Sequence, residues 1–512
     1  MESTVAPPGP PARRLWLGFA LAALALQLAT ITQYGYFRDE LYYLVCARHL
    51  AWGYVDQPPL SLALLALTRM ALGESLVAIR LLPALAGAAT VYVTGMIARE
   101  LGGRGFAQAL ACLAALLSPV FLGTAHVFSM NVFDLLLWTL AALLLTLILR
   151  DGRPRDWVWL GVLMGLGLLN KVSMLWLGMG LLAGLVLTRE RRWLATPWPY
   201  LGGAIAAVMF LPHLIWQVVH GFPTLEFMRN ATRHKMVDVS WVQFVTRQAL
   251  EMGPANAVVW LPGLCFALFA RGGRRWRLLG ILYLAVALLL LAGGRSRASY
   301  LAVAYPMLLA LGGVVIEGAF DARWRALRGV IFAVVLALGL VPIPFALPLL
   351  PVDRFIFYQQ SLHMTPSTEE HLQVGLLPQH YADMFGWEEM VREVAAAYEM
   401  LSPEERKHVV VFGQNYGEAG AIDVLGKKYG LPRAISGHNS YWLWGYGDWD
   451  GSVLIIIGGD PQDNARWFER VTRVGSIQSR YAMPYERGID VSIGRRLTMP
   501  PATAWPRLRM FI

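Results

Sequence analysis

Two adjacent carboxylates, Asp39 and Glu40, follow the first long apolar run of the sequence. Neighbouring residues on a helix differ in direction by about 100°, so only one of the two can point squarely into a site. A carboxylate in that place can accept the proton of an incoming hydroxyl or amine, which is general-base chemistry. The alternative is an interfacial salt bridge with Arg38 or Arg48. These residues alone leave both roles open.

A second polar motif lies in the same stretch and contains Tyr54, Asp56, Pro58 and Pro59. A diproline after an acidic residue fixes an extended turn and starts a helix. We predict that these four residues belong to a loop that contacts the substrate. A plain surface turn with a helix cap is the alternative.

Further charged residues stand beside or inside apolar runs. Asp134 is the clearest case, because an unpaired carboxylate in such a run costs several kcal/mol unless it meets a cation or water. Lys171, Arg295, Arg297 and Arg80 are cations in similar places. Arginine binds phosphate in a bidentate manner, so we predict that these four hold the phosphate of a lipid. For Lys171 the alternative is that the side chain only extends its charged amine to the water at the membrane surface.

These acids and cations are the groups that transfer of a sugar from a polyprenyl-phosphate donor requires. The cations hold the leaving phosphate and stabilise its growing charge, and a carboxylate takes the proton of the acceptor. The hypothesis needs Asp39, Asp134, Lys171 and Arg295 to meet in one outward-facing cavity.

The composition shows what kind of scaffold must position these groups. Of 512 residues, 56% are hydrophobic and 15% are charged, and the mean hydropathy is +0.47. Soluble domains carry about 25% charged residues, so the sequence indicates a polytopic membrane protein rather than a disordered chain or a cytosolic enzyme. The net charge of +10 fits basic residues at the cytoplasmic ends of helices better than nucleic-acid binding. The three cysteines have neither metal-site nor disulfide spacing.

Eleven apolar runs are candidates for membrane spans of about 20 residues. They cover residues 15–33, 79–98, 106–122, 132–149, 157–170, 173–188, 198–219, 256–270, 278–293, 300–317 and 329–350. If Arg13 and Arg14 hold the N-terminus in the cytoplasm, every second loop should be basic. The basic loops near residues 99–104, 150–155, 189–192, 271–277 and 323–328 all follow this rule. An odd number of spans then places the C-terminus outside.

The chain is therefore predicted to be an all-α polytopic membrane bundle followed by a small extracytoplasmic α/β domain. The transmembrane domain takes residues 1–352 and has long outer loops at 34–78 and 220–255, and the α/β domain takes residues 353–512. In the tail we expect helices over 383–401, 416–430 and 461–471 and strands over 408–412 and 453–457. Segments 413–420 and 436–445 combine Asn, Gln, His and Trp, which suits sugar contact, although glycine-rich loops also simply make turns.

Three motifs in the first part of the chain resemble those of a known protein family. Phe37–Glu40 with Tyr42 and Tyr43, then Gly53–Leu60, then Arg80–Gly87 resemble the bacterial branch of the protein O-mannosyltransferase family. That branch is similar to the aminoarabinose transferases of lipid A and the galacturonosyltransferases of lipopolysaccharide core. The resemblance covers about residues 1–350.

The resemblance implies a GT-C fold, an active site at the outer membrane face, and inverting transfer from a polyprenyl-phosphate sugar. It makes Asp39, with Glu40 beside it, the general-base candidate and Asp134 the second acid. Lys171 and Arg295 or Arg297 match cationic positions that face the donor phosphate. Some lipid A transferases have a lysine where this chain has Gln57, which weakens the case for their sugar. Some relatives use a divalent metal near the first acid; the ligands of such a metal are unknown here.

We therefore expect a multi-pass glycosyltransferase of the cytoplasmic (inner) membrane whose N-terminus is cytoplasmic and whose C-terminal domain is periplasmic. Its partners would be a polyprenyl-phosphate sugar lipid and an envelope acceptor that is a lipid, a glycan or a protein. Two rivals are a transporter or flippase without bond chemistry, and an interaction module in which the bundle only anchors the tail. Transporters often carry internal repeats, and none is visible in this sequence.

Overall fold

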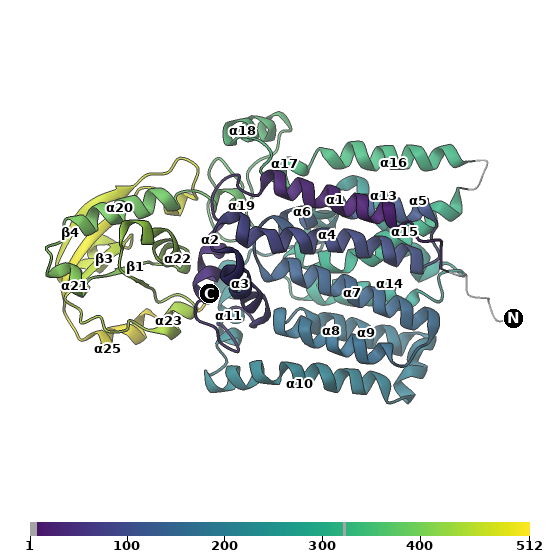
Figure 1. Cartoon of the computed structure of the whole chain (residues 1–512), viewed down its shortest axis with the longest axis horizontal. Coiled ribbons are helices and arrows are strands. Elements are labelled where there is room, and N and C mark those ends of the chain that lie inside the picture. Colours follow the sequence, from purple (N-terminus) through teal and green to yellow (C-terminus); the bar gives the residue numbers. More distant parts are fainter. Residues whose placement is uncertain (1–7, 321–323) are drawn as a thin grey trace. The chain divides into compact units, whose positions relative to one another are not determined.

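The computed structural model describes residues 8–320 and 324–512, and the chain forms two compact units (Figure 1). Unit one contains the residues up to Ile31, Val77–Ile215 and Asp238–Leu349. Unit two contains Thr32–Leu76, Trp216–Val237 and Leu350–Ile512. Much of the two long outer loops thus joins the tail in one compact body. The predicted domain boundary at residue 352 stays a prediction.

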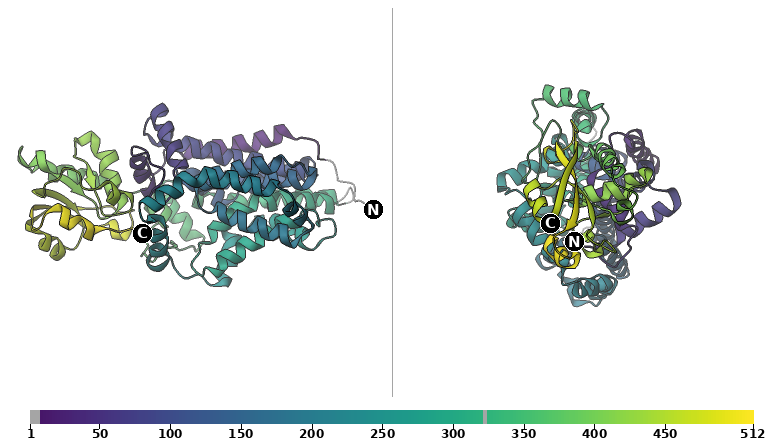
Figure 2. Two further views of the ribbon diagram at one scale, coloured as in Figure 1. Left: turned by 90° about the horizontal axis from the view of Figure 1, so that it is seen from below. Right: turned by 90° about the vertical axis from the view of Figure 1, so that its left-hand side faces the viewer.

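Unit one is a helical bundle, and each of the eleven apolar runs forms helix in it (Figure 2). Its long helices are α1 (Arg13–Thr30), α4 (Leu76–Glu100), α5 (Gly105–Leu116), α6 (Pro119–His126), α7 (Met130–Asp151), α8 (Asp156–Asn170), α9 (Met174–Leu187), α10 (Trp198–Val219), α12 (Trp241–Met252), α13 (Ala257–Phe269), α14 (Arg277–Ala292), α15 (Tyr305–Ala319) and α16 (Arg325–Leu340). Shorter pieces are the 3-10 helices Arg189–Ala195, Pro254–Asn256 and Ala298–Ala304 and the helix α17 (Ile343–Ala346). Leucine, alanine, valine and tryptophan side chains from these helices fill a common core.

The bundle is a membrane domain, but the number of spans is not confirmed as eleven. Among the described residues, four helices are long and apolar enough to cross a membrane. The number rises to six if two bent pairs each count as one span. The pair α5 and α6 bends by 57° before Pro119, and the pair from Trp241 to Phe269 bends by 99° near Pro254. Proline favours such breaks because it lacks an N–H and restricts the residue before it.

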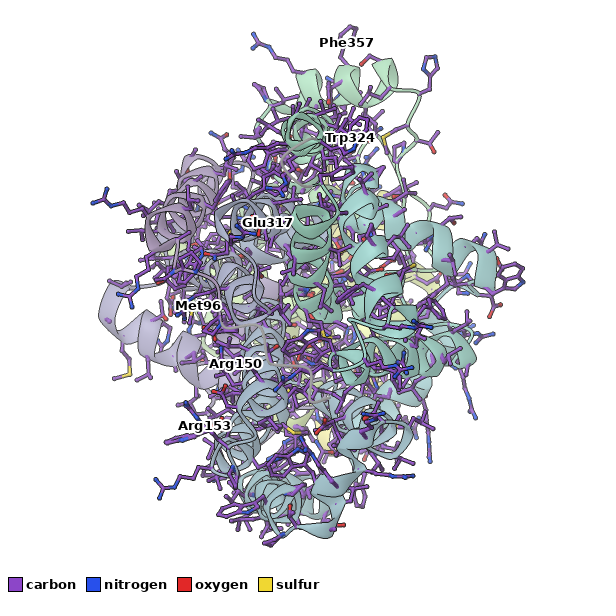
Figure 3. The ribbon with its side chains drawn as sticks, turned by 90° about the vertical axis from the view of Figure 1, so that its right-hand side faces the viewer. Met96, Arg150, Arg153, Glu317, Trp324 and Phe357 are labelled. Atoms are coloured by element: carbon purple, nitrogen blue, oxygen red, sulfur yellow. The ribbon has the colours of Figure 1, made fainter. Side chains whose placement is uncertain are left out.

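The basic loops gather at one end of unit one, the end that Figure 3 faces. There Arg150 pairs with Glu100 and Asp151, and Arg275 donates hydrogen bonds to the backbone oxygens of Leu149 and Arg150. Arg328 donates to the backbone oxygen of Glu317 at the same end. Arg323, part of the fifth basic loop, lies outside the described residues. The helix ends predicted to be cytoplasmic are therefore on one side of the bundle.

Unit two combines short helices of the two long loops with an α/β tail. Its helices are α2 (Arg38–Cys46), α3 (Leu60–Leu72), α11 (Pro223–Asn230), α18 (Val352–Ser361), α19 (Gln379–Ala382), α20 (Trp387–Glu399), α21 (Glu405–His408), α22 (Tyr416–Leu425), α23 (Ser440–Trp444), α24 (Pro461–Trp467) and α25 (Pro501–Ala504). Helix α3 begins directly after Pro59, as the diproline predicted. Single turns of π-helix or 3-10 helix lie at Ala231–Lys235, Gly426–Tyr429, Pro484–Glu486 and Trp505–Leu508.

The tail contains a five-stranded sheet of order β2-β1-β3-β5-β4. The strands are β1 (Val410–Phe412), β2 (Ala434–Ile435), β3 (Val453–Ile457), β4 (Phe468–Ile477) and β5 (Ile489–Leu497). Strand β1 pairs in parallel with β2 and β3, and β5 pairs antiparallel with β3 and β4. Helices α20 and α22 lie together on one side of this sheet (Figure 1).

The predicted helix over 461–471 is wrong in its last four residues. Helix α24 ends at Trp467, and Phe468 starts the ten-residue strand β4. The pairing of β4 with β5 shifts register between Arg473 and Gly475, which marks a β-bulge. The long antiparallel pairing with β5 outweighs the local helix preference, because sheet propensity depends on its tertiary neighbours.

Candidate active site

Asp39 stands at the start of helix α2 and meets the tail directly. Its Oδ1 accepts a hydrogen bond of 2.8 Å from the hydroxyl of Tyr416, the first residue of helix α22. Arg38 Nε lies 3.5 Å from the same oxygen. The carboxylate is partly exposed, with 27% of its side-chain surface accessible. Asp39 is thus fixed by a neutral donor and a cation while it still faces open space.

The neighbouring Arg38 is buried and held from several directions. Its Nη1 donates to the hydroxyl of Tyr485 at 2.8 Å and lies 3.7 Å from Asp383 Oδ2. The backbone N–H of Arg38 also donates to the Asp383 carbonyl. Burial raises the pKa of Asp383 to about 6, even though Arg38 acts in the opposite direction. The guanidinium therefore has a fixed position beside Asp39.

Asp56 of the second motif meets the same helix. Its Oδ1 accepts a hydrogen bond of 2.9 Å from Tyr42, whose ring packs against that of Tyr416 at a centroid distance of 4.8 Å. Burial raises the pKa of Asp56 to about 7, while the Tyr42 hydrogen bond acts to lower it. Two first-loop carboxyls, Asp39 and Asp56, thus lie on one aromatic cluster in unit two.

A cavity of about 220 Å³ opens beside this cluster. Its wall is formed by residues from α2, from the second long loop and from the tail: Arg38, His234, Lys235, Glu370, His371, Leu372, Asn415, Tyr416, His438, Tyr485 and Ile512. Lys235 Nζ lies 3.4 Å from Glu370. Burial lowers the pKa of His438 to about 3, so this imidazole is neutral, and its Nε2 lies 2.9 Å from the carbonyl oxygen of Ile512. The charged groups of the cavity are therefore mainly Arg38, Lys235 and Glu370.

The remaining predicted residues of the first loop have local structural contacts. The Glu40 side chain is fully buried and accepts a hydrogen bond of 2.9 Å from the Phe37 N–H, which caps the start of α2. The Tyr54 carbonyl accepts from Thr224 at 3.2 Å, and the Tyr54 hydroxyl donates to backbone oxygens of its own loop. Pro58 and Pro59 are buried where α3 starts. Of the adjacent acids, Asp39 rather than Glu40 faces the open space.

Unit one holds the second group of predicted residues. Asp134 is 1% exposed, and its Oδ2 accepts a hydrogen bond of 2.6 Å from Ser173 and lies 3.7 Å from Lys171 Nζ. Its Oδ1 has no hydrogen-bond partner among the described residues. Lys171 also donates to Asn131 Oδ1 at 2.7 Å. The predicted acid and the predicted cation are thus direct neighbours.

This pair lies at the end of the bundle opposite the basic loops. Asp134 precedes Arg150 by sixteen residues on the continuous helix α7, a rise of about 24 Å. Lys171 Nζ lies 5.0 Å from the ring centroid of Tyr300, so it also contacts the segment that follows helix α14. Three stretches far apart in the sequence therefore meet here.

The predicted arginines of unit one differ in their surroundings. Arg295 pairs with Asp238 at 2.6 Å, and 35% of its side-chain surface is exposed. Arg297 is half-buried and directly precedes the 3-10 helix Ala298–Ala304. Arg80 is 1% exposed and donates to the Ile31 carbonyl at 3.1 Å, with His126 Nε2 at 3.5 Å. The Arg80 guanidinium is therefore enclosed between helix ends, and its predicted contact with the donor phosphate stays a prediction.

The predicted site residues thus form two groups, one in each unit. Asp39 and Asp56 share a cluster in unit two, and Asp134 and Lys171 are neighbours in unit one. That all of them line one cavity stays a prediction. Sequence reasoning missed Tyr416 as the partner of Asp39, and it missed Asp383 and Tyr485 as partners of Arg38; nothing in their local sequence signals these contacts.

Some relatives use a divalent metal, but the described part of this structure shows no group of ligands for one. Within residues 8–320 and 324–512, no three His, Cys, Asp or Glu side chains are grouped so that they could hold a metal ion. Metal dependence is therefore still a matter for experiment.

Two further carboxyl groups lie close together behind the cavity wall. Asn415 Nδ2 donates to Glu418 Oε1 at 2.8 Å and to Glu486 Oε1 at 3.1 Å, and both glutamates are 4% exposed. Burial raises the pKa of both groups, and the charge of Glu486 raises that of Glu418 further. The folded state therefore keeps protons that the unfolded chain has already released.

This pair makes stability depend on pH. Because the raised pKa values favour the protonated folded form, the stability that this pair contributes is greatest in acid and falls as the pH rises towards neutral. We expect the melting temperature of the wild type to fall between pH 5 and pH 8, and Glu486→Gln to reduce that fall by roughly 1–3 °C for each pKa unit removed. Thermal unfolding at four pH values measures this, with the exposed Glu404→Gln as control. Identical pH slopes for wild type and Glu486→Gln would contradict the assignment.

Comparison with known proteins supports the resemblance stated from the sequence. Residues 56–216 match the dolichyl-phosphate-mannose-protein mannosyltransferase family. The structure of ArnT from Cupriavidus metallidurans bound to undecaprenyl phosphate is similar to 94% of this chain, over 98% of its own, with a TM-score of 0.62 and 15% identity. Its apo form gives a TM-score of 0.59 at 16% identity over 94% of this chain and 97% of its own. No curated protein matches the sequence.

A larger enzyme shares the fold over part of its length. The arabinofuranosyltransferase AftD from Mycobacteria is similar to 96% of this chain but over 40% of its own, with a TM-score of 0.55 and 16% identity. These matches confirm the predicted resemblance, the helical membrane fold of GT-C type with its small sheet, and the predicted class of enzyme: the chain is a membrane glycosyltransferase.

Proposed function

We propose that this enzyme transfers a sugar from a polyprenyl-phosphate donor to an envelope acceptor at the outer face of the cytoplasmic membrane. The observation that carries the proposal is Asp39, an accessible carboxylate fixed by Tyr416 and Arg38 beside a cavity of about 220 Å³. ArnT, which shares the fold over nearly its whole length, binds undecaprenyl phosphate. A lipid of the same phosphate class is the donor that fits both facts.

In the proposed reaction Asp39 is the general base. It takes the proton of the acceptor hydroxyl as the acceptor oxygen attacks the anomeric carbon of the sugar. A new bond forms between that oxygen and the anomeric carbon, and the bond from this carbon to the phosphate oxygen breaks. The attack comes from the side opposite the phosphate, so the anomeric configuration inverts. The lipid phosphate leaves with the bonding electrons.

The departing phosphate needs cations where its negative charge grows. In unit one, Lys171 is the leading candidate, because Asp134, Asn131 and Ser173 hold its surroundings in place. Arg295 and Arg297 follow helix α14 at the same end of unit one and are the second candidates. Arg80 is set aside, since its guanidinium is enclosed between helix ends.

The orientation in the membrane follows from the gathering of basic loops at one end of unit one. Basic residues prefer the cytoplasmic side, so we assign that end to the cytoplasm. The Asp134 end then faces outward, and we infer a periplasmic location for the tail. This assignment is tested by labelling single cysteines placed at Arg153 and at Asp238 with a reagent that cannot cross the membrane. Labelling of position 153 in intact cells would show that the protein has the opposite orientation in the membrane.

The decisive experiment combines cells with purified enzyme. Mass spectrometry of envelope lipids and glycans, with and without the gene, identifies the product that depends on it. The purified full chain in liposomes is then given the labelled polyprenyl-phosphate sugar and the acceptor so identified. We expect a new glycosidic bond and release of polyprenyl phosphate. Movement of labelled lipid across the bilayer with no new bond would instead establish the flippase alternative.

Tyr416 offers a test of how the base is positioned. The Tyr416 hydroxyl donates a hydrogen bond to Asp39, so Tyr416→Phe should change the position of the Asp39 carboxylate. We expect kcat to fall by about tenfold. This is a smaller loss than the 100-fold or more that we expect when the base itself is removed. KM for the donor should stay constant, because Tyr416 is not proposed to bind the donor. An unchanged kcat would show that the Tyr416 hydroxyl does not position the base.

A further inference from the structure

We propose that the tail contains a second saccharide site, which binds one pyranose ring and takes no part in bond chemistry. The site is a cavity of about 190 Å³ on one face of the five-stranded sheet. None of the residues that line it lines the cavity beside Asp39. Its wall combines apolar residues of the sheet strands with three tryptophans and a polar rim.

The floor of this cavity is an apolar sheet face. The register places Phe412 opposite both Ile435 and Ile456, so these three side chains point to the same side. The alternate residues Val411 and Ile455 point to the other side and are completely buried. Helices α20 and α22 lie on one side of the sheet, and α23 and α25 lie towards the other (Figure 1). One face is thus fully packed, while the second keeps a hollow.

Three tryptophans stand around the hollow: Trp449, Trp467 and Trp505. The indole N–H of Trp449 donates to the Val453 carbonyl at 2.8 Å, and that of Trp505 donates to the Trp442 carbonyl at 3.2 Å. These bonds fix the two rings by their polar edges and leave their apolar surfaces for packing. The C–H bonds of a pyranose face carry partial positive charge, which the negative face of an aromatic ring attracts.

The polar rim lies where strands β1 and β3 end. Strand β1 is followed by Gln414, and β3 is followed by Gly459 and Asp460. Strand β2 pairs with one edge of β1, and β3 pairs with its other edge. The direction in which the chain adds strands to the sheet therefore reverses at β1. Ligands of sheets with parallel strands bind outside the carboxyl ends of strands at such a point.

The rim offers mainly hydrogen-bond acceptors. The amide groups of Gln414 and Asn464 donate to the carbonyls of Ile457 and Gly458, at 3.2 and 3.1 Å, so their side-chain oxygens are the ends left for a ligand. Asp460 caps helix α24 by accepting from the N–H groups of Gln462 and Asp463. Asp463 Oδ1 pairs with Arg466 at 2.8 Å. Each carboxylate can still offer its other oxygen as an acceptor. Sugar hydroxyls are donors that match such a rim, whereas a phosphate or an acidic sugar would be repelled.

Gly459 keeps this rim open. Its φ of +80° favours glycine, and a Cβ there would come within 2.8 Å of Gln414 Nε2 and 3.0 Å of Asn464 Oδ1. The volume also limits the occupant, since a cavity of about 150 Å³ holds a benzene ring. A cavity of about 190 Å³ therefore takes one substituted six-membered ring rather than an extended lipid chain.

The test uses the full chain in an amphipathic polymer, because glucoside and maltoside detergents would themselves be ligands. Saturation-transfer difference NMR is recorded with three probes: methyl α-D-glucopyranoside, methyl α-D-mannopyranoside and methyl N-acetyl-β-D-glucosaminide. We expect saturation of the ring protons of at least one probe. Trp467→Ala should weaken that signal by at least about fivefold, the effect of removing an aromatic wall. Trp241→Ala, a change at a 68% exposed tryptophan of unit one, should leave it unchanged.

Two further variants keep the outcome clear. Asp39→Asn should retain the signal, which separates this site from the proposed active site. If Trp467→Ala does not fold, Asn464→Leu at the rim replaces it, with the same loss expected. The proposal is overturned if no probe gives a signal or if neither tail variant weakens it. It is also overturned if cyclohexanol, an apolar ring with one hydroxyl, binds better than every pyranoside.

Discussion

Asp39→Asn is expected to lower kcat for sugar transfer by at least about 100-fold, the usual contribution of a general base. The amide keeps the size of the side chain, and its oxygen can still accept the hydrogen bond from Tyr416. It cannot take a proton from the acceptor, so the chemical step should fail while the protein folds and binds its donor. Transfer is measured in liposomes with the labelled polyprenyl-phosphate sugar, and donor binding is measured separately.

Asp353→Asn is the matched control, because this aspartate of unit two is 71% exposed and, like Asp39, accepts a hydrogen bond of 2.8 Å from a tyrosine hydroxyl, that of Tyr481. Full activity of Asp39→Asn would exclude Asp39 as the base. Equal losses in both variants would point to a general effect of lost charge. A loss of donor binding with Asp39→Asn would place Asp39 in recognition of the donor instead.

Lys171→Met is expected to destabilise unit one strongly as well as to weaken transfer. Asp134 is 1% exposed, and Lys171 is the cation beside it. Removing one partner of a buried ion pair leaves an uncompensated charge, at a cost of about 3–5 kcal/mol. The melting temperature of the purified protein should therefore fall well below that of the wild type.

The double variant Asp134→Asn with Lys171→Met separates structure from function. Removing both charges should restore most of the stability, since no buried carboxylate then lacks a partner. If Lys171 also holds the donor phosphate, the restored protein should still transfer poorly and need more donor for half-maximal rate. A double variant with normal stability and normal transfer would show that the pair is purely structural.

The sequence predicted the helical part of the fold well, because apolar runs of membrane length have few alternatives. In the tail, β1 and β3 were visible as short β-branched runs. Strand β4 was not, because Glu469, Arg470 and Arg473 interrupt its apolar residues and match a helix as well as a strand. Strand β2 has only two residues and gives no periodicity at all.

The sequence allowed prediction of those candidate site residues that are isolated charges in apolar runs. The free-energy cost of a carboxylate in an apolar run was enough to select Asp134, and Lys171 followed from the same argument. The partners of Asp39 and Arg38 were not predictable. Tyr416 and Asp383 lie more than 340 residues further along the chain, and only the folding of the first loop together with the tail in unit two brings them close.

The ten-residue strand β4 forms an edge of the tail sheet, since among the described residues β5 is the one strand that pairs with it. An open edge of that length is a template on which a second copy of the chain could add its own strand and begin to aggregate. The charges of Glu469, Arg470 and Arg473 and the bulge before Gly475 oppose such pairing. The residues that made this strand hard to recognise thus help to keep neighbouring copies of the chain from aggregating.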